Sequence, residues 1–257
     1  MNLRKIISKN LVVKNTLKKI LHIIKLISIK YRRRYSILNI VADILPNTLA
    51  IDVGASYYPH PAFEVFRRSP NNTWVAIEPN EKNLFYLNSW NWPSQVVSFK
   101  MGLSQFGGPQ TLFVTNIDSG SSLLKPNISS SNSHRIKNKS YFFPVKEVEI
   151  DTITLKDVFE KINFNQIPFS MKLDTQGSEF SILKGLQEDV IKNYAICVEL
   201  ENTLLSDPIM EGSAPFFEVL QFFQENGFEL VHLKPIQINA PRVKKVFNSS
   251  YILNECD

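Results

Sequence analysis

Residues 171–186, MKLDTQGSEFSILKGL, join a short apolar run to a charged turn and then to a segment with helical spacing. Lys172 and Asp174 alternate along the apolar run, so both should lie on the same side of a strand that ends at Asp174. Glu179 falls in the first turn of the helix that follows, where an acidic side chain interacts favourably with the helix dipole. Charges at a buried strand end are costly unless they are paired or solvated, so this stretch predicts a polar site at a sheet edge.

Short apolar runs alternate with amphipathic segments on both sides of this stretch. Alternation of this kind predicts a doubly wound, mostly parallel α/β sheet. The predicted strands are 48–53, 73–78, 95–101, 169–174 and 194–200, and the predicted helices are 61–69, 80–90, 154–162, 177–189 and 214–227.

Two further regions interrupt the alternation. Residues 228–233 and 244–253 read as strands with no helix between them, which predicts an antiparallel hairpin at one edge of the sheet. Residues 109–116 and 141–150 predict an extra strand pair, separated by the polar stretch 117–140. A loop of this length is typical of a lid, a binding loop or a flexible segment.

The charge of the chain is unevenly distributed. Residues 1–42 contain eleven Lys or Arg and no acid, whereas the remainder of the 257 residues carries 18 basic and 24 acidic side chains. The body of the protein is therefore acidic, and we expect no nucleic-acid partner. The sequence predicts a basic amphipathic arm over 1–45 and one globular domain over 46–257.

The arm has two interpretations. Its apolar residues follow helical spacing, so residues 1–36 either contact an anionic membrane surface or pack on their own domain with the lysines outward. Lysines interrupt every apolar run, so we expect neither a membrane span nor a cleavable signal. Cys197 lies in a predicted core strand and Cys256 at the end of the sequence, which favours a reducing, cytoplasmic compartment, peripheral to the inner face of a membrane if the arm binds lipid.

Small and acidic residues follow the first two predicted strands. Ligands of open α/β sheets bind beyond the carboxyl ends of the strands, where small residues permit close approach of the backbone. A carboxylate at the end of the second strand can accept both hydroxyls of a ribose. The residues that predict this nucleoside site are Asp52, Gly54, Ala55 and Ser56 in IDVGAS, and Glu78, Pro79 and Asn80 in AIEPN.

The same turn indicates which nucleoside is bound. Dinucleotide folds use G-x-G-x-x-G to seat a pyrophosphate, but this turn has a single glycine, Gly54. A strand-end acid and glycine followed by a ribose-binding acid suit S-adenosylmethionine better. An NAD(P)-dependent enzyme remains an alternative, as does a methyltransferase-like binding module without catalysis, although the acids Asp52, Glu78 and Asp174 argue against the latter.

The stretches IDVGAS, AIEPN, GSSLL and MKLDTQGSEFSILKGL resemble the FkbM family of S-adenosylmethionine-dependent methyltransferases over about residues 49–233. The resemblance implies a seven-stranded class I methyltransferase (Rossmann-like) sheet whose final strand is antiparallel, and methyl transfer usually to a hydroxyl oxygen. The sequence departs from the family pattern at Tyr57 and Tyr58, where many relatives carry a second glycine. The family signature is matched at Lys172, Asp174, Gln176, Gly177, Glu179, Leu183, Lys184 and Gly185.

Asp174 is the first candidate for a base or for a group that orients the acceptor. Lys172 is expected beside it, and Glu179 has either a site role or a role at the helix terminus. Gly102 and Ser104 follow the third strand, where an adenine ring would rest. The expected acceptor is a small molecule or glycan with a hydroxyl group.

The sequence offers further candidates for site residues. They are the loop bases His60 and His134, Glu199 in the acceptor pocket, and the serine turn at Ser121 and Ser122. No His and carboxylate cluster has metal-ligand spacing, so we expect no obligatory metal, although Asp174, Glu199 and Glu201 are a weak candidate set for one.

Overall fold

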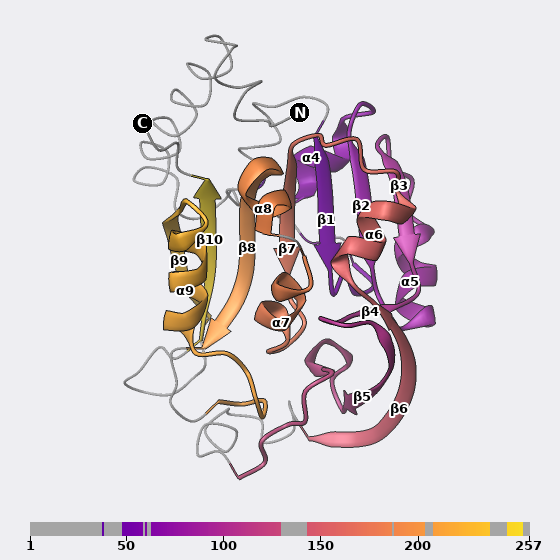
Figure 1. Ribbon diagram of the computed structural model, residues 1–257. Helices are drawn as coiled ribbons and strands as arrows, with labels where there is room; N and C mark the ends of the chain where they lie inside the picture. The colour runs from indigo at the N-terminus through magenta and orange to yellow at the C-terminus, as the bar shows by residue number, and fades with distance from the viewer. Residues whose placement is uncertain are drawn as a thin grey trace.

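The structure is a computed structural model, and it describes residues 38, 48–58, 60, 63–129, 143–186, 188–203, 208–236 and 246–253. Within these residues a seven-stranded sheet has the order β3-β2-β1-β7-β8-β10-β9 (Figure 1). The strands are β1 Leu49–Val53, β2 Thr73–Ile77, β3 Gln95–Phe99, β7 Phe169–Leu173, β8 Ala195–Thr203, β9 Phe228–Ile236 and β10 Val246–Leu253. The first five in spatial order pair in parallel, which confirms the prediction of a mostly parallel α/β sheet.

Both faces of the sheet are buried, as is usual for parallel strands. In β1, Ile51 and Val53 belong to one hydrophobic cluster, whereas Ala50 belongs to a second cluster on the other face. Successive side chains of a strand point to opposite faces, so one apolar run contributes to both clusters. The polar side chains at the ends of these strands therefore sit at the rim of a closely packed core.

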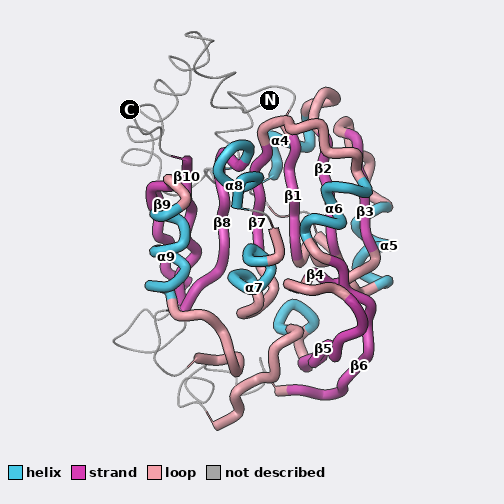
Figure 2. The backbone as a smooth tube through the Cα atoms, viewed as in Figure 1, coloured by secondary structure: helices cyan, strands magenta, loops and turns pink. Residues whose placement is uncertain are grey.

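Helices cover each face of the sheet (Figures 1 and 2). On one face lie α6 Leu155–Lys161, α7 Glu179–Lys184, α8 Glu188–Tyr194 and α9 Phe216–Glu225, and on the other lie α4 Glu64–Arg68 and α5 Glu81–Asn88. Asn80 caps α5 by accepting from the Lys82 N–H at 3.0 Å. Helix α6 begins with a capping box between Thr154 and Asp157, which satisfies backbone donors at its first turn.

The single helix predicted over 177–189 was wrong, because the chain forms α7 and α8 there. A Cβ at Gly185 would lie 2.9 Å from the carbonyl oxygen of Gln105, so the backbone passes too close to that loop for another residue type. Helical spacing does not reveal this close approach, which lies at the end of α7.

The pairing of β9 with β10 is antiparallel, as predicted. Strand β10 also pairs antiparallel with β8 and lies between β8 and β9. The antiparallel strand is thus inside the sheet, and β9 forms the edge.

A second, three-stranded sheet lies beyond the carboxyl ends of the central strands (Figure 1). It contains β4 Gly102–Leu103, β5 Gly108–Thr115 and β6 Pro144–Ile153, and a 3₁₀ turn, η2 Asp118–Gly120, follows β5. The antiparallel pairing of β5 with β6 confirms the predicted extra strand pair. Residues 130–140 of the predicted loop, with His134, and all of the arm except Leu38 lie outside the described residues.

Candidate active site

A cavity of about 720 Å³ opens at the carboxyl ends of β1, β2 and β7, a size typical of small-molecule sites. The second sheet supplies an apolar wall, with Leu112 and Val114 from β5 and Val148 and Ile150 from β6. Of the residues predicted for the site, those that line the cavity are Gly54, Ser56, Glu78, Pro79, Asn80, Gly102, Ser121, Ser122 and Asp174.

The turn after β1 is fixed by close backbone contacts. Gly54 has a φ of 71°, and a Cβ there would lie 2.0 Å from the carbonyl oxygen of Asp174. The N–H groups of Gly54 and Ala55 both donate to the carbonyl of Ile77, at 3.0 and 3.2 Å. Only glycine fits this position, because it tolerates the positive φ and has no side chain to collide. Ala55 is buried in the core and does not line the cavity.

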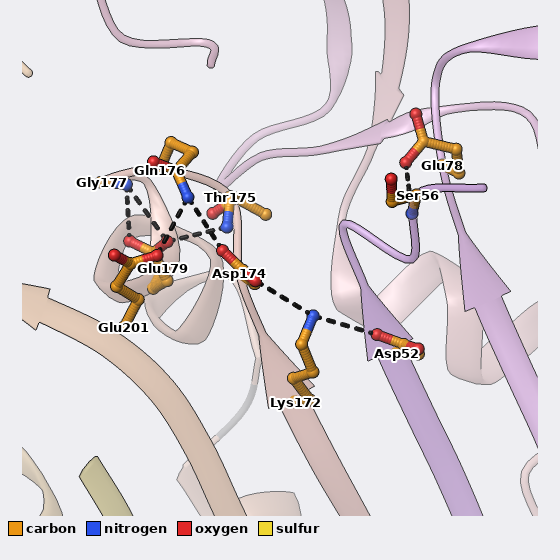
Figure 3. A network of polar contacts seen from close by, with 10 residues as sticks. All are labelled: Asp52, Ser56, Glu78, Lys172, Asp174, Thr175, Gln176, Gly177, Glu179 and Glu201. Atoms are coloured by element: carbon orange, nitrogen blue, oxygen red, sulfur yellow. Dashed lines mark hydrogen bonds and ion pairs between the residues drawn. The ribbon is translucent and has the colours of Figure 1, made fainter. Parts of the chain in front are cut away.

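Glu78 follows β2 and is held by the backbone on both sides. Its Oε2 accepts from the Ser56 N–H at 2.8 Å, and its Oε1 accepts from the Asn80 N–H at 2.9 Å (Figure 3 shows the Ser56 contact). Burial raises the pKa of Glu78, against the lowering effect of these bonds. A carboxylate oxygen has more than one lone pair, so both oxygens retain capacity for a further donor. The group is therefore oriented in advance for a ligand with two hydroxyls.

Lys172 of β7 bridges two carboxylates, Asp52 on the neighbouring strand β1 and Asp174 directly after the end of β7 (Figure 3). Its Nζ lies 3.3 Å from Asp52 Oδ1 and 3.4 Å from Asp174 Oδ2. Burial disfavours the charged ammonium, but the two carboxylates outweigh it and raise the pKa of Lys172. Lys172 and Asp52 are buried and do not line the cavity, whereas 36% of the Asp174 side chain is exposed. Asp52 therefore acts on the cavity through Lys172, not by direct contact.

Burial raises the pKa of Asp52 despite Lys172, and its second oxygen, Oδ2, is buried without a hydrogen-bond partner among the described residues. The pKa of Asp174 is instead lowered, because Lys172 and several hydrogen bonds together outweigh the effect of burial. Asp174 is thus an ionised carboxylate at the wall of the cavity.

Gln176 joins Asp174 to an acid on the next strand (Figure 3). Its Nε2 donates to Asp174 Oδ1 at 3.0 Å and to Glu201 Oε2 at 2.9 Å. Burial and the neighbouring Asp174 charge raise the pKa of Glu201 well above its usual value, whereas the pKa of Asp174 is lowered, so Glu201 takes up a proton before Asp174 does. Sequence reasoning considered Glu201 only as a metal ligand. The signal for its role is its place in β8 beside the end of β7, which requires the strand register.

Glu179 lies beneath the turn that carries Asp174, not in the cavity. Its carboxylate accepts from the N–H groups of Thr175 at 2.8 Å and Gly177 at 2.8 Å. Burial outweighs these bonds and raises its pKa to about 7. The geometry favours a positioning role for Glu179, in which it fixes the turn by satisfying backbone donors.

The remaining candidates divide between the cavity and the protein interior. Ser122 donates its hydroxyl to the carbonyl of Gln176 at 3.0 Å, which ties the cavity wall to the Asp174 turn. Ser104 is buried and forms a hydrogen bond with the Thr152 hydroxyl at 2.8 Å. It does not line the cavity, so its predicted place beside an adenine ring was wrong. Glu199 is also buried away from the cavity. His60 favours ionisation of Asp174 by its charge, without lining the cavity.

Neither a metal cluster nor a membrane span is found in the described part of the chain. No three His, Cys, Asp or Glu side chains there are placed to hold a metal ion. None of the described helices combines the length and the apolar character that crossing a bilayer requires.

A family model described as the methyltransferase FkbM domain matches residues 52–230. The chain belongs to the FkbM methyltransferase family. The predicted family is thereby confirmed, and the matched range includes every residue of the cavity named above. Curated proteins give no match to this FkbM-family chain.

Several solved structures are similar to this FkbM-family chain. One is magnesium protoporphyrin IX methyltransferase (ChlM) from Synechocystis PCC 6803 with bound SAM, at 7% identity and a TM-score of 0.41, with 95% of this chain and 82% of that chain covered. Another is a SAM-dependent methyltransferase from Aquifex aeolicus, at 13% identity and a TM-score of 0.37, with 81% and 83% covered. At these values the likenesses carry no argument about function.

Proposed function

We propose that this chain is an S-adenosylmethionine-dependent methyltransferase that methylates a hydroxyl oxygen of a sugar, glycan or other hydroxylated metabolite. The observation that supports this function is the convergence of Gly54, Ser56, Glu78 and Asp174 on one cavity in a chain of the FkbM family. The cofactor supplies an electrophilic methyl group when bound. An NAD(P)-dependent function is not proposed, because the family is one of methyltransferases.

The cavity residues fit this cofactor. Glu78 would accept the two ribose hydroxyls, since Ser56 and Asn80 hold its carboxylate in place and leave acceptor capacity on both oxygens. The side chains of Met101, Leu103 and Ile77 line the cavity and would surround an adenine ring with apolar groups. Gly54 lines the cavity at the same edge, and its lack of a side chain lets the carbonyl of Asp174 pack against it.

Asp174 would accept a hydrogen bond from the acceptor hydroxyl. Alignment of the hydroxyl oxygen with the methyl carbon and sulfur is the main requirement of this displacement, in which a C–O bond forms and a C–S bond breaks. The hydroxyl becomes strongly acidic only as its oxygen bonds to carbon, so a weakly basic carboxylate suffices to receive the proton. Lys172 keeps Asp174 ionised and therefore ready as an acceptor.

The proposal is tested by thermal shift. S-adenosylhomocysteine at about 100 times its dissociation constant should add about 2.7 kcal/mol to the free energy of unfolding, whereas NAD should add nothing. Glu78→Ala should lose most of the shift measured against its own unliganded melting temperature. Glu160→Ala, an exposed glutamate of α6 paired with Lys156, is the matched control and should keep the full shift. A shift with NAD, or unchanged affinity for S-adenosylhomocysteine in Glu78→Ala, would contradict the proposal.

A further inference from the structure

Aromatic side chains outside the cavity form a continuous row on the side of the sheet covered by α4 and α5. The ring of Tyr58 meets that of Trp90 edge-on at 5.4 Å, and Trp90 stacks on Trp92 at 6.0 Å. Trp92 lies 5.3 Å from the buried Trp74, and the Arg67 guanidinium lies 4.3 Å above the Trp92 ring. We call Tyr58, Trp90 and Trp92 the aromatic row. Its inner end is anchored in the core, so the row is held rigidly.

The outer end of the aromatic row is exposed. Tyr58 is 55% exposed and Trp90 is 46% exposed, and the adjacent Tyr57 is also 55% exposed. Packing of the domain does not require large rings in solvent at neighbouring positions. Contiguous exposed aromatic surface of this kind marks an interaction site.

Leu38, which directly follows the basic N-terminal segment in the sequence, lies on the same side of the sheet. Leu38 is fully buried in the hydrophobic cluster that contains Phe66 and Trp74, and Trp92 packs against that cluster. Residues 1–37, which precede Leu38 directly, contain eleven Lys or Arg and no Asp or Glu. The positive charge of this segment is thus tethered to the face that carries the aromatic row.

We propose that this face docks on an anionic lipid bilayer, with the rings of Tyr58 and Trp90 in the headgroup region and the basic residues of 1–37 near the lipid phosphates. Trp and Tyr favour this region because one part of the ring system is apolar and another forms hydrogen bonds with water. Each Lys or Arg near such a surface contributes about 1 kcal/mol. A sugar would also stack on aromatic rings, but it would make no use of the concentrated positive charge. The inference does not depend on the proposed methyl transfer.

Vesicle flotation of the full chain tests the proposal. The protein should bind vesicles of phosphatidylcholine with added phosphatidylglycerol, and much less to phosphatidylcholine alone. Binding should fall steeply between 0.1 and 1 M salt, where the screening length decreases from about 10 Å to about 3 Å. The double variant Tyr58→Ala/Trp90→Ala should lower the partition coefficient about tenfold, because it removes the rings that insert. Phe217→Ala on α9 is the matched control, since this residue is 72% exposed on the opposite side of the sheet.

Quenching of tryptophan fluorescence by brominated lipid gives a second measurement. Trp74 is buried and Trp92 is only partly exposed, so Trp90→Phe should remove most of the quenching. Melting temperatures of all variants establish that they are folded. The proposal is overturned if the protein does not bind the anionic vesicles, if the double variant binds as the wild type does, or if quenching is absent or unchanged in Trp90→Phe. Absence of quenching is also the result expected if residues 1–37 cover the row themselves.

Discussion

Replacing Asp174 by Asn removes the negative charge of this side chain at the cavity and keeps its shape. Lys172 retains its contact with Asp52 at 3.3 Å, so no ammonium is left unpaired in the core. The Asp174 side chain is 36% exposed, and solvent therefore weakens the pair that is lost. We expect a cost of about 1 kcal/mol, which lowers the melting temperature of a chain of this size by about 2–4 °C.

The expected loss of activity is much larger than this loss of stability can explain. A domain with a free energy of unfolding of about 5 kcal/mol or more stays over about 99% folded after losing 1 kcal/mol. A carboxylate that positions a hydroxyl or receives its proton contributes about 100-fold or more to the rate, equivalent to about 2.7 kcal/mol of activation free energy. Turnover in Asp174→Asn should therefore fall at least about 100-fold with S-adenosylhomocysteine affinity nearly unchanged.

Hydroxylated metabolites are first screened for an acceptor. Three quantities are then measured for each variant: the melting temperature, the affinity for S-adenosylhomocysteine by calorimetry, and the rate at which S-adenosylhomocysteine is released during turnover. Asp157→Asn is the matched control, because Asp157 closes the capping box of α6 at a distance from the cavity. It should cost about 1 kcal/mol without loss of turnover. A stable Asp174→Asn enzyme with full activity would refute the assignment, and so would equal loss of activity in the two variants.

Three further changes probe the scaffold of the site. Gly54→Ala should cost more than about 3 kcal/mol, because its Cβ would lie 2.0 Å from the carbonyl oxygen of Asp174 at a φ of 71°; an unchanged urea midpoint would contradict this. Lys172→Met leaves Asp52 buried without its cation and should cost about 3–5 kcal/mol at pH 8, with a cost that decreases as the pH is lowered and the carboxyl takes up a proton; a cost that does not change with pH in chemical denaturation would argue against an isolated charge. Glu179 has a pKa of about 7 in the folded protein, above its usual 4.5, so the folded state holds a proton that the unfolded chain has released between these pH values. The unfolding free energy of wild type relative to Glu179→Gln should therefore fall by roughly 3 kcal/mol from pH 4.5 to pH 8, and a difference independent of pH would exclude this titration.

The central strands were predictable because buried parallel strands are continuous apolar runs. Strand β4 was not predicted, since two residues have no periodicity. It exists because Gly102 packs against β6, where a Cβ would lie 2.9 Å from the Ile150 side chain. The prediction therefore failed where a tertiary contact, not a local pattern, determines the structure.

The candidate site likewise contains one contact that a local pattern predicts and one that it does not. The placement of Lys172 beside Asp174 follows from alternation within one strand, and their 3.4 Å contact confirms it. The link from Asp174 to Glu201 depends on how β8 aligns with β7, where the register shifts between Phe169 and Ser170. No local pattern specifies a register shift, so this partner of Asp174 became visible only in the structure.

The position of β10 between β8 and β9 affects how the protein is made. Residues 246–253 are translated after both neighbouring strands, so the ribosome produces β8 and β9 before the strand that separates them. Until then β8 has an unpaired edge, which is able to pair with another nascent chain. A stall in translation between residues 236 and 246 would leave the edges of β8 and β9 that pair with β10 without a partner. Chaperones that cover such edges during synthesis would have their greatest effect on yield at that stage.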